Sequence, residues 1–199
     1  FVPHAEPSDM TDDALYRPKS ENTGEAFLGT EARFDVPEVF WMTKDKGKLD
    51  FLELFAGKAV LSYCASQAGL QTGQPIDINT GYDLNTYEGQ QKAWKVIKDG
   101  QPEVVYMAVV CGPWSNLQNI NDRNMVLKKR KQIMPMVRFC VDVAQYQIRT
   151  GRKFIIENPE TSHIWKVKEF CDLATMTNVV WNTVDMCRHG MKDPLSKLP

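Results

Sequence analysis

The sequence lacks any apolar stretch long enough to cross a membrane, since no uninterrupted run approaches the roughly 20 residues that a spanning helix needs. It also lacks a basic-then-apolar signal segment, an internal repeat and a low-complexity tract. These absences argue against a membrane partner and a fibrous protein. What remains is a chain of 199 residues, 43% apolar and 25% charged, which is typical of a globular protein.

Paired cysteines and clustered histidines are missing as well. The cysteine count is odd and no CxxC pair occurs, which argues against a disulfide framework or a zinc site and favours reduced thiols inside a cell. His163 and His189 have no metal-ligand spacing, so we expect no metal. We expect three cysteines, Cys64, Cys140 and Cys171, to lie in the core.

Charge is nearly balanced overall, at -1, but it is unevenly distributed. Acidic side chains dominate residues 1–50, and basic ones are in excess from residue 51 onward. We interpret residues 1–49 as an acidic, partly extended arm that packs on the core through its apolar segment 37–42, and residues 50–199 as a catalytic domain. The basic excess in this domain is compatible with a polyanionic partner.

The hydrophobic pattern of the domain alternates between strands and helices. Apolar runs predict strands at 51–55, 73–78, 104–110, 154–156 and 178–186. Periodic segments predict a helix over 88–99 and one ending near 150 with Pro135 in its first turn or at a kink. They also predict a helix over 60–68, with one apolar face formed by Val60, Leu61, Cys64, Ala65 and Ala68. This alternation predicts an α/β fold with a mostly parallel sheet flanked by helices. Ligands of such folds bind beyond the carboxyl ends of the strands.

Polar, reactive or glycine residues follow every predicted strand. In order, the strand ends carry Leu54-Phe-Ala-Gly57, Asp77 with Gly81-Tyr-Asp-Leu84, Cys111-Gly-Pro-Trp-Ser115, Glu157-Asn158, and Asp185-Met-Cys-Arg-His189. This ordered set resembles that of cytosine-C5 DNA methyltransferases. Two segments are also similar in sequence to methyltransferase-like domains of retroelement polyproteins: Gly81-Tyr-Asp-Leu84 and Glu157-Asn-Pro-Glu-Thr-Ser-His-Ile-Trp165. The resemblance covers about residues 50–190 and implies a Rossmann-like, S-adenosylmethionine-dependent fold.

The resemblance implies a nucleophilic mechanism. Cys111 would add to carbon 6 of cytosine, so that carbon 5 gains the electron density to accept a methyl group. Glu157 would hold and protonate N3, Asn158 would fix the loop, and Arg188 would contact the base or a phosphate. A target base in duplex DNA would have to be flipped out of its stack.

The resemblance also implies a cofactor site for S-adenosylmethionine. Phe55 and Ala56 would lie against the cofactor, Gly57 would let the backbone approach, Asp77 would accept from the ribose hydroxyls and Asp83 from the adenine amino group. Ile78 and Leu84 would flank them. Trp114 would stack on a ring or pack in the core.

Several residues depart from the family pattern. Val109-Val110 replace the proline before the nucleophile, Gly112 replaces a glutamine, and Lys58-Ala59 stand where a second glycine is usual. Two alternatives therefore stay open: an adenine-N6 methyltransferase using Cys111-Gly-Pro-Trp114, or a silent methyltransferase fold that binds cofactor, nucleic acid or another protein. We expect DNA rather than RNA as the partner, a further domain or partner for target recognition, and a nuclear location. The run Lys128-Lys-Arg-Lys131 is either a solvated face or a phosphate contact.

Overall fold

The computed structural model describes residues 47–185, all of which fall in one of the chain's two compact units, residues 36–199. The predicted apolar segment 37–42 lies outside the described residues. Leu49, at the end of the predicted arm, already belongs to the domain, because its backbone N–H donates to Gly100 O at 2.8 Å and its carbonyl accepts from Glu103 N at 2.9 Å.

The centre of the described domain is a three-stranded parallel sheet. Its strands β1 (Phe51–Leu54), β2 (Val104–Ala108) and β3 (Lys153–Glu157) lie in the order β1-β2-β3. All three coincide with predicted strands. The structure thus confirms a mixed α/β fold with a parallel sheet flanked by helices. This fold is compatible with a Rossmann-like arrangement, but a sheet of three strands is too small to define one.

The predicted strand at 73–78 is replaced by two isolated parallel bridges to β1, Phe51 with Thr72 and Leu54 with Ile76. Pro75 interrupts this segment, because it has no N–H to donate to a ladder. The chain still runs beside β1, since Gly73 N donates to Phe51 O and Ile76 N to Glu53 O, each at 2.9 Å.

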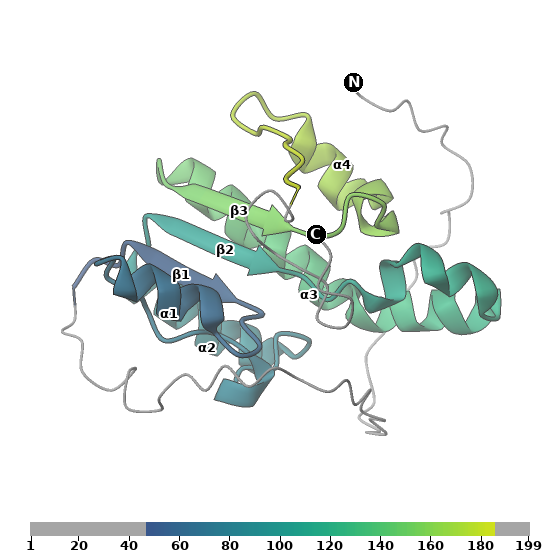
Figure 1. Cartoon of the computed structure of the whole chain (residues 1–199), viewed down its shortest axis with the longest axis horizontal. Helices are drawn as coiled ribbons and strands as arrows, with labels where there is room; N and C mark the ends of the chain where they lie inside the picture. The colour runs from purple at the N-terminus through teal and green to yellow at the C-terminus, as the bar shows by residue number, and fades with distance from the viewer. Residues whose placement is uncertain (1–46, 186–199) are drawn as a thin grey trace. The chain divides into compact units, whose positions relative to one another are not determined.

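Helices lie on both faces of the sheet (Figure 1). Helix α1 (Val60–Gln67) lies in front of β1, whereas α2 (Tyr87–Gly100) and α3 (Arg123–Arg149) run behind the sheet, and α4 (Lys168–Ala174) packs on α3. The main core lies between the sheet and the helices behind it. It contains fully buried side chains from β1, β2, α2 and α3, among them Leu52, Leu54, Ala93, Ile97, Val105, Met107, Val137 and Val143.

The predicted buried face of α1 is wrong. Leu61 is 39% exposed, Cys64 is exposed, and the buried residue of the helix is Ser62. The expectation that Cys64 lies in the core is therefore also wrong, whereas that for Cys140 is confirmed and Cys171 is half-buried. Helix α1 is held by polar contacts instead: Glu53, buried in β1, accepts from both the backbone N–H and the hydroxyl of Ser62.

Two further expectations need correction. Residues 178–185 form no strand, and Val180 and Trp181 stay 88% and 56% exposed. Trp181 instead packs edge-on against Trp165, with ring centroids 4.5 Å apart. Of the two predicted positions of Pro135, the first turn is wrong, because Asp122 caps α3 through Met125 N at 2.9 Å and Pro135 lies well inside the helix. No helix in the described part of the chain is both long and apolar enough to cross a membrane.

Glu53 makes the stability of the domain dependent on pH. Burial raises the pKa of Glu53 above its ordinary value of 4.5, against the hydrogen bonds from Ser62, which favour the carboxylate. A raised pKa in the folded state means that protonated Glu53 stabilises the fold. That contribution is complete below the unfolded pKa and is lost as the pH rises through the folded one.

We therefore expect the free energy of unfolding of the wild type, relative to Glu53→Gln, to fall as the pH rises above 4.5 and then to level off. Chemical denaturation over a series of pH values measures this difference. Glu88→Gln is the matched control with the opposite sign, because the exposed Glu88 has its pKa lowered by Lys92. A flat difference for Glu53→Gln would contradict the assignment.

Candidate active site at the carboxyl edge of the sheet

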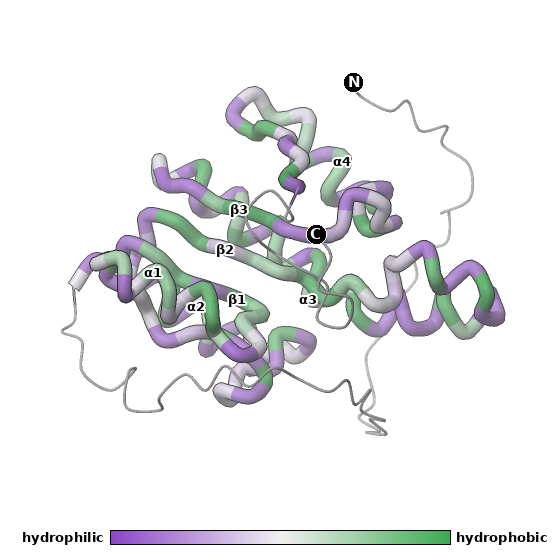
Figure 2. The backbone as a smooth tube through the Cα atoms, viewed as in Figure 1, coloured by the Kyte–Doolittle hydropathy of each residue, from purple (hydrophilic) through white to green (hydrophobic). Residues whose placement is uncertain are grey.

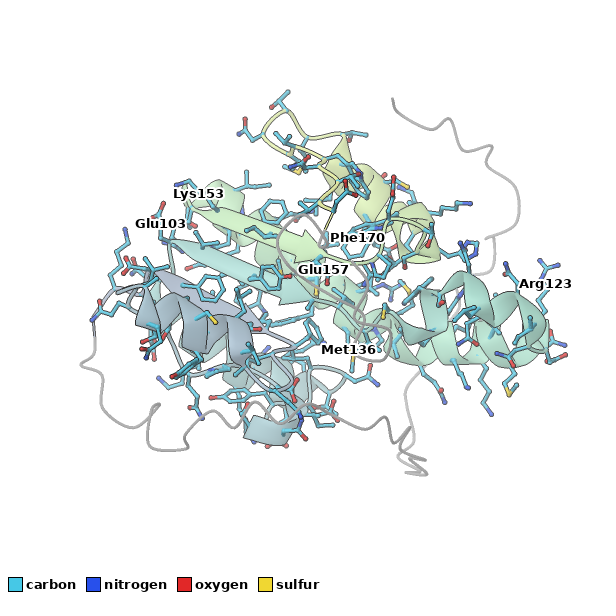
Figure 3. The ribbon with its side chains drawn as sticks, in the orientation of Figure 1. Glu103, Arg123, Met136, Lys153, Glu157 and Phe170 are labelled. Atoms are coloured by element: carbon cyan, nitrogen blue, oxygen red, sulfur yellow. The ribbon has the colours of Figure 1, made fainter. Side chains whose placement is uncertain are left out.

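The carboxyl ends of the three strands meet at one edge of the sheet. Parallel pairing sets Leu54 opposite Met107 and Ala108 opposite Glu157, so the segments that follow each strand start side by side. Figure 3 shows Glu157 at this edge, with Glu103 and Lys153 at the opposite end of the strands. Most of the predicted site residues belong to these segments.

The turn between β1 and α1 has an unusual backbone. Phe55, Gly57 and Ala59 all have left-handed backbone angles, with φ values of 58°, 53° and 56°. Such a conformation is rare for phenylalanine and costs free energy, and strain of this kind gathers at ligand sites. Two N–H groups of the turn have partners within the protein, since Ala56 N donates to Ile76 O at 3.3 Å and Ala59 N to Ala56 O at 2.7 Å. Ala59 stands where the family pattern usually has a second glycine, and it adopts the left-handed conformation that glycine favours.

Asp77 closes this turn from the neighbouring segment. Its carboxylate accepts from Gly57 N at 2.9 Å and from Asn79 N at 3.0 Å, and its own N–H donates to Thr80 Oγ1 at 2.9 Å. These bonds bring two predicted cofactor residues together. They also fix the short helix η2 (Ile78–Thr80), which leaves the Ile78 side chain 66% exposed.

Asp83 and Leu84 lie in the loop that leads into α2. Leu84 is buried in the core, whereas Asp83 is half-buried and its carboxylate accepts from Asn85 N at 3.0 Å. The loop presses on α2 at Gly89, where a Cβ would come within 2.0 Å of Asp83 O. Only glycine therefore lets this loop lie where it does.

The loop after β2 exposes Cys111 and buries Trp114. Cys111 is exposed and caps the short helix η3 (Gly112–Trp114), which is followed by η4 (Asn116–Ile120). Trp114 is only 4% exposed, and the guanidinium carbon of Arg130 lies 5.1 Å from its ring centroid. This environment favours packing over cofactor stacking for Trp114.

Asn158 joins the loops after β2 and β3. Its side-chain amide donates to Val109 O at 2.6 Å, and the residue is 9% exposed. Val109 lies two residues before Cys111, and Glu157 lies one residue before Asn158. The hydrogen bond therefore holds the segment that precedes the thiol next to the end of β3.

A hollow of about 430 Å³ opens beside the β1–α1 turn. Two predicted cofactor residues, Phe55 and Ala56, line it together with Glu53, Tyr106 and residues of α1. Burial, followed by the negative charges of Glu157 and Glu53, raises the pKa of Tyr106 to about 12. Both acids therefore lie close enough to Tyr106 to disfavour its ionised form.

The structure gathers most of the predicted site but not all of it. Gly57 and Asp77 are in contact, and the Cys111 and Glu157 segments are joined through Asn158. Arg188 lies outside the described residues. Among residues 47–185, no three His, Cys, Asp or Glu side chains are grouped in a way that could hold a metal ion.

Sequence reasoning missed Glu53, Tyr106 and Arg130. A signal existed for Glu53, since an acid within the apolar run 51–55 has to find hydrogen bonds when that run is buried. The roles of Tyr106 and Arg130 depend on contacts between distant segments.

Comparison of the chain with protein-family models, curated proteins and solved structures finds no match.

The left-handed turn yields a test by glycine substitution. Glycine relieves the strain at Ala59, which offsets its greater entropy in the unfolded chain. Ala68 has φ -77° at the end of α1, where glycine has no such advantage. We expect Ala59→Gly to be about 1–2 kcal/mol more stable than Ala68→Gly in thermal or chemical unfolding. Equal effects of the two substitutions would argue against strain at Ala59.

The two hydrogen bonds that the Asp77 carboxylate accepts, from Gly57 N and Asn79 N, yield a second test. In Asp77→Asn, one of the two N–H donors meets an amide NH₂ instead of an oxygen, and that hydrogen bond no longer forms. We expect the free energy of unfolding to fall by about 1–2 kcal/mol. Asp99→Asn removes an exposed ion pair with Lys95 and should change stability by less than about 0.5 kcal/mol. Similar decreases in both variants would show that Asp77 does not hold the turn.

Proposed function

We propose that this domain transfers a methyl group from S-adenosylmethionine to carbon 5 of cytosine in DNA. The observation that carries the proposal is the exposed Cys111 thiol on a loop that Asn158 ties to the end of β3, where Glu157 lies. A nucleophile and a proton donor on adjacent strand ends are what this reaction requires.

The residues at the β1–α1 turn fit an adenosyl cofactor. Gly57 has open space where a side chain would stand, and the exposed Ile78 offers an apolar surface to a flat ring. Asp77 is half-exposed, so its carboxylate can accept ribose hydroxyls in addition to the two N–H groups it already holds. S-adenosylmethionine would supply an electrophilic methyl group on a positively charged sulfur.

The chain's own residues would act in the following order. Cys111, as the thiolate, would form a bond to carbon 6 while Glu157 gives a proton to N3. Carbon 5 would then take the methyl group as its bond to the sulfonium breaks, which leaves S-adenosylhomocysteine as the neutral thioether. Loss of the carbon 5 proton to solvent water would break the bond between carbon 6 and Sγ, restore the aromatic ring and return the N3 proton to Glu157. Asn158 keeps the Cys111 loop in place throughout. Arg188 remains a proposed contact to the base or a phosphate.

A DNA duplex containing 5-fluorocytosine tests the chemistry. Fluorine at carbon 5 cannot leave as a proton would, so the Cys111 adduct should accumulate when S-adenosylmethionine is present, and denaturing electrophoresis would detect it. We expect Cys111→Ser to abolish the adduct. Cys171→Ser should retain it and serves as the control, because Cys171 is a second free thiol, lies on α4 and does not line the hollow beside the β1–α1 turn.

Other outcomes separate the alternatives. Methyl transfer to adenine that survives Cys111→Ser would identify the adenine-N6 reaction instead. Calorimetry tests the cofactor site by itself, and binding of S-adenosylmethionine without transfer to any nucleic acid would identify a silent fold. An adduct that disappears equally in Cys171→Ser and Cys111→Ser would contradict the role of Cys111.

A further inference from the structure

The first half of α3 extends beyond the carboxyl ends of the strands. Figure 1 shows this part of the helix projecting past the sheet, and Figure 3 places Arg123 at its far tip and Met136 close to the sheet. Thirteen residues of helix span about 20 Å. The projecting half therefore forms a surface of its own, next to the candidate active site.

This surface is strongly basic and its charges are not neutralised. Arg123, Lys128, Lys129 and Lys131 are all exposed, and in the described part of the chain they form no ion pair with an acid, whereas Lys92, Lys95 and Lys168 each do. The single acid between residues 116 and 131 is Asp122, which is engaged in capping α3. Figure 2 shows hydrophilic and hydrophobic stretches alternating along this half of the helix. Four unpaired cations in two and a half turns favour a polyanion.

Arg130 connects this surface to the Cys111 loop. Its Nε donates to Pro113 O at 2.9 Å, and its guanidinium lies over the buried ring of Trp114. Gln118 Nε2 donates to Gly112 O at 3.0 Å from the other side of the loop. An anion bound along α3 is therefore positioned relative to the Cys111 thiol.

Exposed apolar side chains lie in the segment of the chain that connects the Cys111 loop to the basic helix. Leu117 and Ile120, both in η4, are 77% and 89% exposed. Many nucleic-acid-binding proteins bind the phosphates with basic side chains and contact the bases with neighbouring apolar side chains. Exposed apolar residues near a basic surface fit this mode of binding.

We propose that the projecting half of α3 binds the phosphate backbone of DNA through Arg123, Lys128, Lys129 and Lys131, and that Leu117 and Ile120 contact its bases. The choice of DNA rests on the proposed function. The phosphate chemistry is shared with RNA, and the experiment distinguishes the two.

Fluorescence anisotropy with a labelled duplex DNA, over a range of salt concentrations and without cofactor, tests the proposal on the full chain. Replacing Lys128, Lys129 and Lys131 by glutamine should raise Kd about tenfold or more. It should also lower the slope of log K against log salt by about 0.9 for each phosphate that the variant no longer neutralises. The matched control replaces Lys92, Lys95 and Lys98 of α2, which removes the same charge, and should leave the slope unchanged.

Ile120→Ser provides an independent readout, since it should raise Kd several-fold with an unchanged salt slope. Melting curves show whether each variant is folded. Equal weakening by the two triple variants, or no binding by the wild type, would overturn the proposal. Tighter binding to duplex RNA of the same sequence would overturn the choice of DNA. The binding assay contains no cofactor and is independent of the adduct assay. Salt-dependent binding that requires the α3 lysines would therefore support DNA binding by this surface even if no Cys111 adduct forms.

Discussion

Parallel pairing of three strands is the constraint on which the rest of the domain depends. It brings the ends of β1, β2 and β3 to one edge, where the backbone leaves the ladder and its N–H and carbonyl groups need new partners. Two side chains supply them: Asp77 accepts from Gly57, and Asn158 donates to Val109. The same bonds that satisfy the backbone therefore also assemble the candidate site.

On the face of the sheet that α1 covers, a buried polar residue of β1 positions the neighbouring helix. Glu53 lies within an apolar run, and its carboxylate holds the start of α1 through Ser62. Helix α1 consequently docks by hydrogen bonds, and its apolar side chains line a hollow instead of filling a core. The hollow, the strained turn and Asp77 form one continuous region, which is the part of the domain best suited to an adenosyl group.

The basic half of α3 and the Cys111 loop form a second region on the same edge. Arg130 links them, because its side chain meets both Pro113 and the ring of Trp114. The proposed cofactor site and the proposed polyanion-binding surface would then share the edge of the sheet that carries the exposed thiol. Trp114 is buried and packs beneath Arg130.

The sequence by itself determined the elements whose apolar pattern is strong, such as β2 within 104–110 and α2 over 87–100, because burial on both faces of a strand or one face of a helix leaves a periodic signature. It did not determine 73–78, where Pro75 interrupts the ladder, or 178–185, where apolar residues found no neighbouring strand. Only the tertiary structure decided which polar groups meet. Gly57 and Asp77 are 20 residues apart, and Val109 and Asn158 are 49 apart. No local pattern encodes such contacts, because hydrogen-bond partners are chosen by the positions that the folded sheet imposes on both segments at once.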